Sequence, residues 1–194
     1  MKILHIDSSI QGEGSVSRSL SAAAVETLAA QHPEAEIEYR DLAAEPLDHL
    51  TFQNIATAEA KAVLEQFKAA DIVVIGAAFY NFSVASQLKS WIDRLAVAGE
   101  TFRYGPNGAE GLMGGKQVVV ALARGGLYGE GTAQRSFEHA ETWLRSVLSF
   151  IGIDDPRFVI AEGVAMGPEP RAQAVADAMA EARALDAVSD RKAA

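Results

Sequence analysis

The sequence predicts an α/β domain of three layers, in which a five-stranded parallel sheet carries helices on both faces. Short apolar segments alternate five times with longer segments of helical periodicity, which is the pattern of repeated strand–helix units. The most apolar of the short segments are continuous runs rich in Val, Ile and Ala, as expected of strands that are covered on both sides. Polar or glycine-rich residues follow several of these segments and mark the connections to the next helix.

The elements of the first half follow from the spacing of apolar residues. Lys2–Asp7 is predicted to be a short buried strand, and Glu36–Asp41 alternates as a strand near a sheet edge does. Ser17–Gln31 and Asn54–Ala70 repeat apolar residues every three or four positions and are predicted helices, the first of which ends at a His-Pro pair. Asp71–Ala77, a continuous apolar run, is the third expected strand.

The second half continues the alternation. The apolar positions Leu88, Trp91, Ile92 and Leu95 mark one face of a helix that we expect to end at Gly99. The expected elements, in order, are a helix at Ser86–Gly99, a glycine-rich loop at Phe102–Gly115, a strand at Lys116–Ala123, a helix at Ala133–Ile151, a strand at Pro156–Gly163 and a closing helix at Pro170–Ala187.

The composition limits the classes of protein to which the chain can belong. Its 194 residues suit one domain, expected over residues 1–194. Lys and Arg total 17 against 26 Asp and Glu, so the net charge is −9, which argues against nucleic-acid binding and against anionic membrane surfaces. The chain has no cysteine, which excludes disulfides and thiolate chemistry. Because a strand is expected from Lys2 and no apolar run approaches the roughly 20 residues of a membrane helix, we expect a cytoplasmic protein.

The fold class also predicts where a ligand binds. In open parallel sheets the ligand lies outside the carboxyl ends of the strands, where the strand order reverses. The loops after the first, third and fourth strands are therefore the candidates, and they read SSIQGEGSVSRS, AFYNFS and RGGLYGEG.

The first of these loops has the composition of a phosphate site. It leads into a helix N-terminus, whose unpaired N–H groups attract anions, and Ser15 and Ser17 add hydroxyl donors. A plain serine-capped helix is the alternative interpretation. A dinucleotide site is a second alternative, with Asp41 as the ribose-binding acid, but the third glycine of that fingerprint is missing. A loop rich in hydroxyl groups suits a terminal monophosphate better.

The other two loops suit a flat ring. Phe79 and Phe82 are placed to wall a ring such as an isoalloxazine, and Asn81 offers both donors and an acceptor to its polar edge. Ordinary core aromatics are the alternative for the two Phe residues, and a plain turn is the alternative for the Gly-Gly of the third loop. No catalytic side chain and no metal site is indicated, since the four histidines have no partners at suitable spacing. Any chemistry is then expected to come from a cofactor.

These motifs, taken together, resemble the FMN-dependent NADH-azoreductase and NAD(P)H quinone reductase family of flavodoxin-like fold, over most of the chain. The resemblance is densest in YNF at 80–82, SQLK at 86–89, TFRY at 101–104, RGG at 124–126, FIGI at 150–153 and AEG at 161–163. It implies the strand order 2-1-3-4-5 and a homodimer. The resemblance also implies three groups of site residues. The phosphate and ribityl end of FMN is expected to be held by Ser9, Ser15, Val16 and Ser17, and the ring and ribityl chain are expected to be lined by Phe79, Tyr80, Asn81, Phe82, Ala123, Arg124, Gly125 and Gly126. The residues that the resemblance places at the substrate pocket are Tyr104 and Phe150.

The sequence also departs from that family. Ala78-Phe79 stands where the family often has Pro-Met, Ala123 stands where it often has Ser, and the segment from Leu47 to Asn54 is short. These differences concern substrate range more than FMN binding. The leading hypothesis is an enzyme that transfers two electrons from NADH or NADPH to quinones and azo compounds by a ping-pong mechanism. A one-electron carrier of the flavodoxin type and a flavin-free interaction protein are the alternatives.

Overall fold

A parallel sheet of five strands forms the centre of the fold. In the computed structural model, which describes residues 1–186, the strands run in the order β2-β1-β3-β7-β8, and every neighbouring pair is parallel. This arrangement confirms the predicted order 2-1-3-4-5. A further two-residue strand, β4, pairs antiparallel with the end of β3. The bounds of these strands are Lys2–Asp7 for β1, Glu36–Asp41 for β2, Ile72–Tyr80 for β3, Ser83–Val84 for β4, Gln117–Arg124 for β7 and Arg157–Glu162 for β8.

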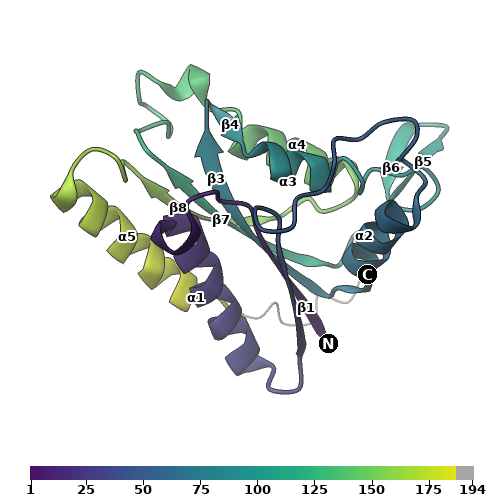
Figure 1. Ribbon diagram of the computed structural model, residues 1–194, viewed down its shortest axis with the longest axis horizontal. Helices are drawn as coiled ribbons and strands as arrows, with labels where there is room; N and C mark the ends of the chain where they lie inside the picture. The colour runs from purple at the N-terminus through teal and green to yellow at the C-terminus, as the bar shows by residue number, and fades with distance from the viewer. Residues whose placement is uncertain (187–194) are drawn as a thin grey trace.

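Helices cover both faces of the sheet (Figure 1). On one face α1, Val16–Gln31, packs beside α5, Pro168–Arg183, and the apolar faces of both helices join one core. The opposite face carries α2, Ala58–Ala69, α3, Ser86–Ile92, and α4, Glu141–Phe150, over a second core that contains Phe67 and Trp91. Two short 3-10 helices, η1 at Gly12–Gly14 and η2 at Arg135–Phe137, lie in the loops after β1 and β7.

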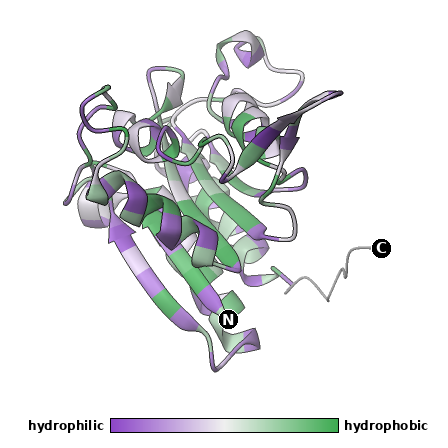
Figure 2. Cartoon of the chain, turned by 90° about the vertical axis from the view of Figure 1, so that its right-hand side faces the viewer, coloured by the Kyte–Doolittle hydropathy of each residue, from purple (hydrophilic) through white to green (hydrophobic). Residues whose placement is uncertain are grey.

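The hydropathy of the strands follows their position in the sheet. In Figure 2 the central strands are mostly green, whereas the edge strand β2 is mostly purple. The strand β3 is buried along seven consecutive residues, as a strand covered on both faces must be. In β2, the first four residues are exposed, in agreement with the prediction that this strand lies at a sheet edge.

The third helix is shorter than predicted, because α3 ends at Ile92 and not at Gly99. The hydroxyl of Thr101 donates to the carbonyl of Leu95 at 2.5 Å and accepts from the N–H of Val97 at 3.0 Å. The guanidinium of Arg94 also donates to the carbonyl of Ser90 at 2.7 Å. These side-chain partners satisfy the backbone groups that a continuing helix would have used, so the chain turns after one short helix.

The predicted loop at Phe102–Gly115 contains a β-hairpin instead. The strands β5, Phe102–Gly105, and β6, Gly108–Gly111, pair antiparallel around the two-residue turn Pro106-Asn107. Gly111 lies so close to the chain at Ile151 and Gly152 that a Cβ there would overlap the backbone. The N–H of Met113 also donates to the carbonyl of Ile151 at 2.8 Å, and both contacts fasten the hairpin to the end of α4.

Two further helices begin later than predicted. The expected helix from Ala133 starts at Glu141, since the carboxylate of Glu138 accepts the N–H groups of Ala140 and Glu141 at 2.9 and 2.7 Å and so fixes the first turn there. Phe137, expected on an inward helical face, lies in η2 and is 50% exposed. The helix α2 starts after Thr57, whose side chain accepts the N–H of Ala60, rather than at residue 54.

The closing helix α5 runs from Pro168 to Arg183, so it begins two residues earlier and ends earlier than the predicted Pro170–Ala187, of which only residue 187 lies outside the described residues. No helix among residues 1–186 is both long enough and apolar enough to cross a membrane.

Candidate functional site

The three loops that the sequence singles out meet at one edge of the sheet. The hydroxyls of Ser9, after β1, and Tyr80, at the end of β3, lie 3.0 Å apart. The ring of Phe79, also on β3, packs on Tyr128, in the loop after β7, with centroids 4.6 Å apart. The strand order therefore brings together residues that are far apart in the sequence, as predicted for the carboxyl ends of parallel strands.

The loop between β1 and α1 presents buried hydroxyl groups at a helix N-terminus. The side chain of Ser15 caps α1 by accepting the N–H of Arg18 at 3.3 Å, and its Oγ lies 3.1 Å from that of Ser17. Ser9, Ser15 and Ser17 are each at most 2% exposed. The N–H groups of Val16 and Ser17 belong to the first helical turn, where no intrahelical acceptor exists. This end of the site therefore offers several neutral donors to an anion.

The carboxylate of Asp41 is engaged by donors of the protein itself. It accepts two hydrogen bonds from Arg18, each 2.7 Å long, and also accepts the N–H groups of Ala43 and Ala44. The hydrogen bonds from Arg18 lower the pKa of Asp41 to about 2, against the cost of partial burial. With its oxygens engaged in this way, Asp41 does not support the dinucleotide interpretation of the sequence.

The second loop is a tight turn between β3 and β4. Asn81 and Phe82 form its two central residues, with φ angles of 47° and 73°. Both angles lie in the left-handed region, which glycine adopts easily and other residues adopt at a cost. The turn holds an exposed amide, Asn81, beside the half-exposed ring of Phe82, which packs 5.3 Å from Phe137 and 6.4 Å from Tyr128. Strain of this kind is typical of functional sites.

The third loop offers backbone N–H groups rather than side chains. The carbonyls of Arg124, Gly125 and Gly126 accept the N–H groups of Val164, Ala165 and Gly163, at 3.0–3.1 Å. The N–H groups of Gly125 and Gly126 have no acceptor among the described residues. Ala123, which precedes the loop, packs against the core beneath α1 and α5. This loop can therefore donate to a ligand through its backbone.

The side chain of Arg124 points into a cluster of carboxylates and is 1% exposed. It donates to Glu162 at 2.8 Å and to Glu141 at 2.6 Å, and it lies 3.3 Å from Glu138. Burial lowers the pKa of Arg124, but the hydrogen bonds to Glu162 and Glu141 outweigh it, and the pKa is raised. Arg124 was expected to line the ring, and in this arrangement only its backbone is free to do so.

The carboxylate cluster supports the site from behind. Glu162 also accepts the N–H of Tyr128 at 3.0 Å, and so holds the loop that carries this ring. Glu138 caps α4, and the N–H of the next residue, His139, donates to the carbonyl of Phe82 at 3.0 Å. Sequence reasoning gave Glu162 and the motif around it no physical role, because its partners lie on other elements.

A cavity of about 810 Å³ opens beside the turn. Phe79, Tyr80 and Asn81 line it, as does Ile10 from the loop after β1. Its other walls were missed as functional residues, namely Ser83, Val84, Ala85, Ser86, Gln87, Lys89 and Trp143. For residues 83–89 the sequence held a signal, since they continue directly from the turn at residues 80–83, which we call the aromatic turn. Trp143 is distant in the sequence and joins them only in the fold, where Lys89 lies over its ring at 5.5 Å. The cavity is large enough for a small aromatic molecule.

Tyr104 and Phe150 lie together, away from these loops. Both rings contact Phe102, with centroid distances of 5.4 Å for Tyr104 and 4.5 Å for Phe150. Tyr104, on β5 one residue pair from the end of the hairpin, is 76% exposed. No ring contact within residues 1–186 joins this pair to the aromatic turn, so one copy of the chain does not bring them onto the cavity.

Comparison with known proteins gives consistent results. The family model described as flavodoxin-like fold matches residues 1–185. A protein of Methylorubrum populi named FMN-dependent NADH:quinone oxidoreductase is 54% identical, and the match covers 96% of this chain and all of that protein. An azoreductase structure from Bacillus anthracis strain Sterne has a TM-score of 0.87 at 29% identity, over 94% of this chain and 97% of the other. An FMN-dependent NADH-azoreductase of strain Ames Ancestor, solved in complex with FMN, has a TM-score of 0.83 at 25% identity, over 94% and 95% of the two chains.

Proposed function

The chain belongs to the flavodoxin-like family of FMN-dependent NADH:quinone oxidoreductases and azoreductases, and from this premise we propose that it transfers two electrons from NADH to quinones and azo compounds by a ping-pong mechanism. It is an oxidoreductase with FMN as cofactor and NADH as electron donor. The observation that carries the proposal is the meeting, at one sheet edge, of a hydroxyl-lined helix N-terminus and an aromatic turn.

The residues at the first loop fit the phosphate of FMN. A phosphate dianion needs several donors, and the hydroxyls of Ser9, Ser15 and Ser17, together with the first-turn N–H groups of α1, are such donors. In the structure each of these hydroxyls is paired with another hydroxyl, and such a hydrogen atom is free to rotate toward a stronger acceptor. We propose that Ser9, Ser15, Val16 and Ser17 hold the phosphate end.

The residues at the second and third loops fit the ring. Phe79, Phe82 and Tyr80 provide apolar and aromatic surface, and the amide of Asn81 is exposed beside them. The N–H groups of Gly125 and Gly126, which lack acceptors within residues 1–186, suit the polar edge of a flat heteroaromatic ring. We propose that residues 79–82 and the backbone of residues 123–126 line the ring and the ribityl chain.

The chain contributes binding and orientation rather than reactive groups. When bound, FMN supplies the redox chemistry that no side chain of the site offers. None of the residues that line the 810 Å³ cavity is a histidine, an aspartate or a glutamate. We therefore propose that water supplies the protons of the reaction, while the walls of the cavity hold the donor and the acceptor in turn beside the ring.

If the donor and the acceptor stack in turn on the same face of the ring, they cannot be bound together, and the kinetics are expected to be ping-pong. With NADH varied at several fixed quinone concentrations, double-reciprocal plots are expected to be parallel. Intersecting lines would require donor and acceptor to be bound together and would contradict the mechanism. A one-electron carrier, the second candidate, would show slow steady-state turnover of NADH with quinone, so the same assay separates the two functions.

The cofactor is expected to be FMN rather than FAD, because the serine loop suits a terminal phosphate and Asp41 is bound to Arg18. Heat release followed by chromatography identifies the flavin, and recovery of mainly FAD would contradict this assignment.

We also propose that the enzyme is a homodimer whose partner completes the substrate pocket. Tyr104 and Phe150, which the family resemblance assigns to that pocket, do not reach the cavity of their own chain, and aromatic rings such as Phe52, at 97%, are exposed. A two-fold axis would bring the same rings to two sites at once. Light scattering under assay conditions tests the proposal, and a fully active monomer would refute it. One domain over residues 1–194 and a cytoplasmic location are further proposals.

A further inference from the structure

Arg18 joins three separate segments beneath the phosphate loop. From the first turn of α1, its side chain reaches back to the carbonyl of Ser9 with two hydrogen bonds, 3.2 Å from Nε and 2.8 Å from Nη2. It donates to both carboxylate oxygens of Asp41 at 2.7 Å, and to the hydroxyl of Tyr39 at 3.0 Å. Its side chain is only 16% exposed.

These contacts use the whole hydrogen-bonding capacity of the guanidinium. An arginine side chain has five N–H donors and no acceptor, and the five hydrogen bonds to Ser9, Asp41 and Tyr39 account for all of them. Arg18 therefore has no donor left for a phosphate. Its charge is also compensated, because Asp41 is bound bidentately and Asp7 lies 3.9 Å away.

The same residue holds both ends of the loop. Its side chain binds the carbonyl of Ser9, where the loop begins, and its backbone N–H binds the hydroxyl of Ser15, where the loop ends. Ser9 in turn orients its neighbours, since its hydroxyl accepts the N–H of Gln11 at 3.3 Å and lies 3.0 Å from the hydroxyl of Tyr80. Fixing Ser9 and Ser15 through one residue fixes the separation of their hydroxyls.

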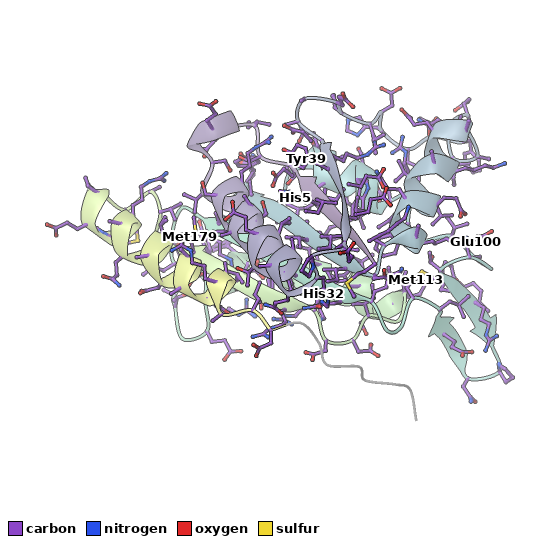
Figure 3. All side chains as sticks on the ribbon, turned by 90° about the horizontal axis from the view of Figure 1, so that it is seen from below. His5, His32, Tyr39, Glu100, Met113 and Met179 are labelled. Carbon is purple, nitrogen blue, oxygen red and sulfur yellow. The ribbon has the colours of Figure 1, made fainter. Side chains whose placement is uncertain are left out.

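The partners of Arg18 are themselves anchored in the sheet. Asp41 is held by the N–H groups of Ala43 and Ala44. Tyr39 donates to Asp7 at 3.2 Å, and its ring packs 4.9 Å from that of His5, beside α1 (Figure 3). The contacts of Arg18 with Ser9, Tyr39 and Asp41, which we call the Arg18 clamp, therefore join the loop after β1, the end of β2 and the start of α1.

We propose that Arg18 is a positioning residue that closes the phosphate-binding loop, with Asp41 as its counter-ion and anchor. It sets the spacing at which the hydroxyls of Ser9, Ser15 and Ser17 converge on one phosphate group. This inference rests on the proposed binding of FMN. The two possible roles of Arg18 can be separated by experiment. A positioning role requires the geometry of the guanidinium, whereas direct attraction of the phosphate requires only its positive charge.

Binding of FMN and riboflavin to the flavin-free protein tests the proposal, since the two ligands differ only in the phosphate. Fluorescence quenching gives both dissociation constants. Arg18→Lys keeps the charge but loses the planar guanidinium with its five N–H donors. The dissociation constant for FMN is therefore expected to rise about tenfold or more, which corresponds to about 1.4 kcal/mol. That for riboflavin is expected to stay within about twofold. Arg183→Lys, on the exposed end of α5, is the matched control and is expected to change neither.

Other outcomes contradict the positioning role. An unchanged FMN affinity in Arg18→Lys, or equal losses for FMN and riboflavin, would overturn it. Asp41→Asn is expected to weaken FMN in the same selective way, whereas tighter FMN binding with a steeper salt dependence would mean that Arg18 binds the phosphate directly. Should Arg18→Lys fail to fold, Tyr39→Phe removes one hydrogen bond of the clamp and is expected to give a smaller loss in the same direction, while an unchanged FMN affinity there would count against the proposal. A wild-type protein that binds FMN no better than riboflavin would instead refute the proposed phosphate site itself.

Discussion

The proposed FMN site has a phosphate end at residues 9–17 and a ring end at residues 79–82 and 123–126. Each end is held from behind by an arginine among carboxylates, but the two arginines act differently. Arg18 binds a backbone carbonyl of the loop that it supports, and it uses all five of its donors. Arg124 binds only carboxylates, its Nε has no partner, and it reaches the ring end through Glu162 and Glu138. The phosphate end is thus fixed directly by neighbouring residues, whereas the ring end depends on the assembly of the whole fold.

The strain in the backbone shows the same contrast. At the phosphate end only Gly12 has a positive φ, 55°, which glycine adopts at little cost. At the ring end Asn81 and Phe82 carry positive φ angles without being glycines. The ring end is held in an unfavourable shape by surrounding contacts, and it is the end that needs the more rigid support.

Removing the buried charge of Arg124 at the ring end is expected to have the largest effect of these changes, and it acts on the unfolding free energy. Arg124→Met leaves Glu138 and Glu162 without their buried counter-ion, and loss of one member of a buried ion pair costs about 3–5 kcal/mol of unfolding free energy. Urea unfolding of the flavin-free protein measures it. The control is Arg145→Met, whose side chain is 47% exposed on the same cluster and whose loss is expected to cost no more than about 1 kcal/mol. Equal costs for both variants would remove the contrast between the ends.

A charge placed at the phosphate end is expected to act on binding and not on folding. Ser15→Asp puts a carboxylate beside the phosphate, at a cost of about 1–4 kcal/mol, or roughly 5- to 1,000-fold in FMN affinity. Aspartate is also a good N-cap, so the unfolding free energy is expected to change by less than about 0.5 kcal/mol. Titration with FMN and with riboflavin measures the effect, and Ser17→Asp is expected to add to it. Retained FMN affinity would place the phosphate elsewhere.

Acid is expected to lower the stability that the pair of Arg18 and Asp41 contributes at the phosphate end, and this effect is smaller. Because the pKa of Asp41 is lowered from its ordinary value to about 2 in the folded protein, its contribution to stability is present above about pH 4 and is lost as the pH falls through about 2. Solvent screens this partly exposed pair, so we expect about 1 kcal/mol. The difference in unfolding free energy between wild type and Asp41→Asn is expected to shrink by that amount from about pH 5 to about pH 2. A difference that stays constant with pH would contradict the assignment.

The smallest expected effect is that of Asn81→Gly at the strained turn. Asparagine tolerates the left-handed region, so the unfolding free energy is expected to change by less than about 0.5 kcal/mol. Asn81→Ala, which lacks that tolerance, is expected to cost about 1 kcal/mol. Both variants lose the amide and are expected to bind FMN and riboflavin more weakly to the same degree. A selective loss of FMN would move Asn81 to the phosphate end.

The regular elements of the fold were predictable because they depend on local spacing. The five long strands were predicted from this spacing, their order was implied by the family resemblance, and the meeting of three loops at one edge followed from the fold class. The helix bounds that were predicted wrongly depend on single side chains. Examples are Thr101 at the end of α3 and Glu138 at the start of α4. The hairpin at residues 102–111 was predicted as a loop, although the sequence holds a turn signal there, Gly-Pro-Asn-Gly. Arg103 and Glu110, a pair of opposite charge, flank this turn.

The supports behind the site were not predictable in the same way. Arg18 and Asp41 are 23 positions apart, and Arg124 meets Glu162 across 38 positions. Nothing in the spacing of the sequence joins such pairs, because their contact follows only from the strand order. The polar residues that we propose to face the ligand could therefore be named from the sequence, whereas the supporting role of the charged residues behind them could not be.

The clamp around the loop at residues 9–15 also bears on how quickly a ligand is captured. Every contact of Arg18 is made between parts of the chain itself, so the loop is ordered when the protein folds. The entropy of ordering these residues is then lost during folding and not during association. Mixing the flavin-free protein with FMN should accordingly give a single fast phase whose rate rises in proportion to concentration, as for docking onto a surface that already has its final shape.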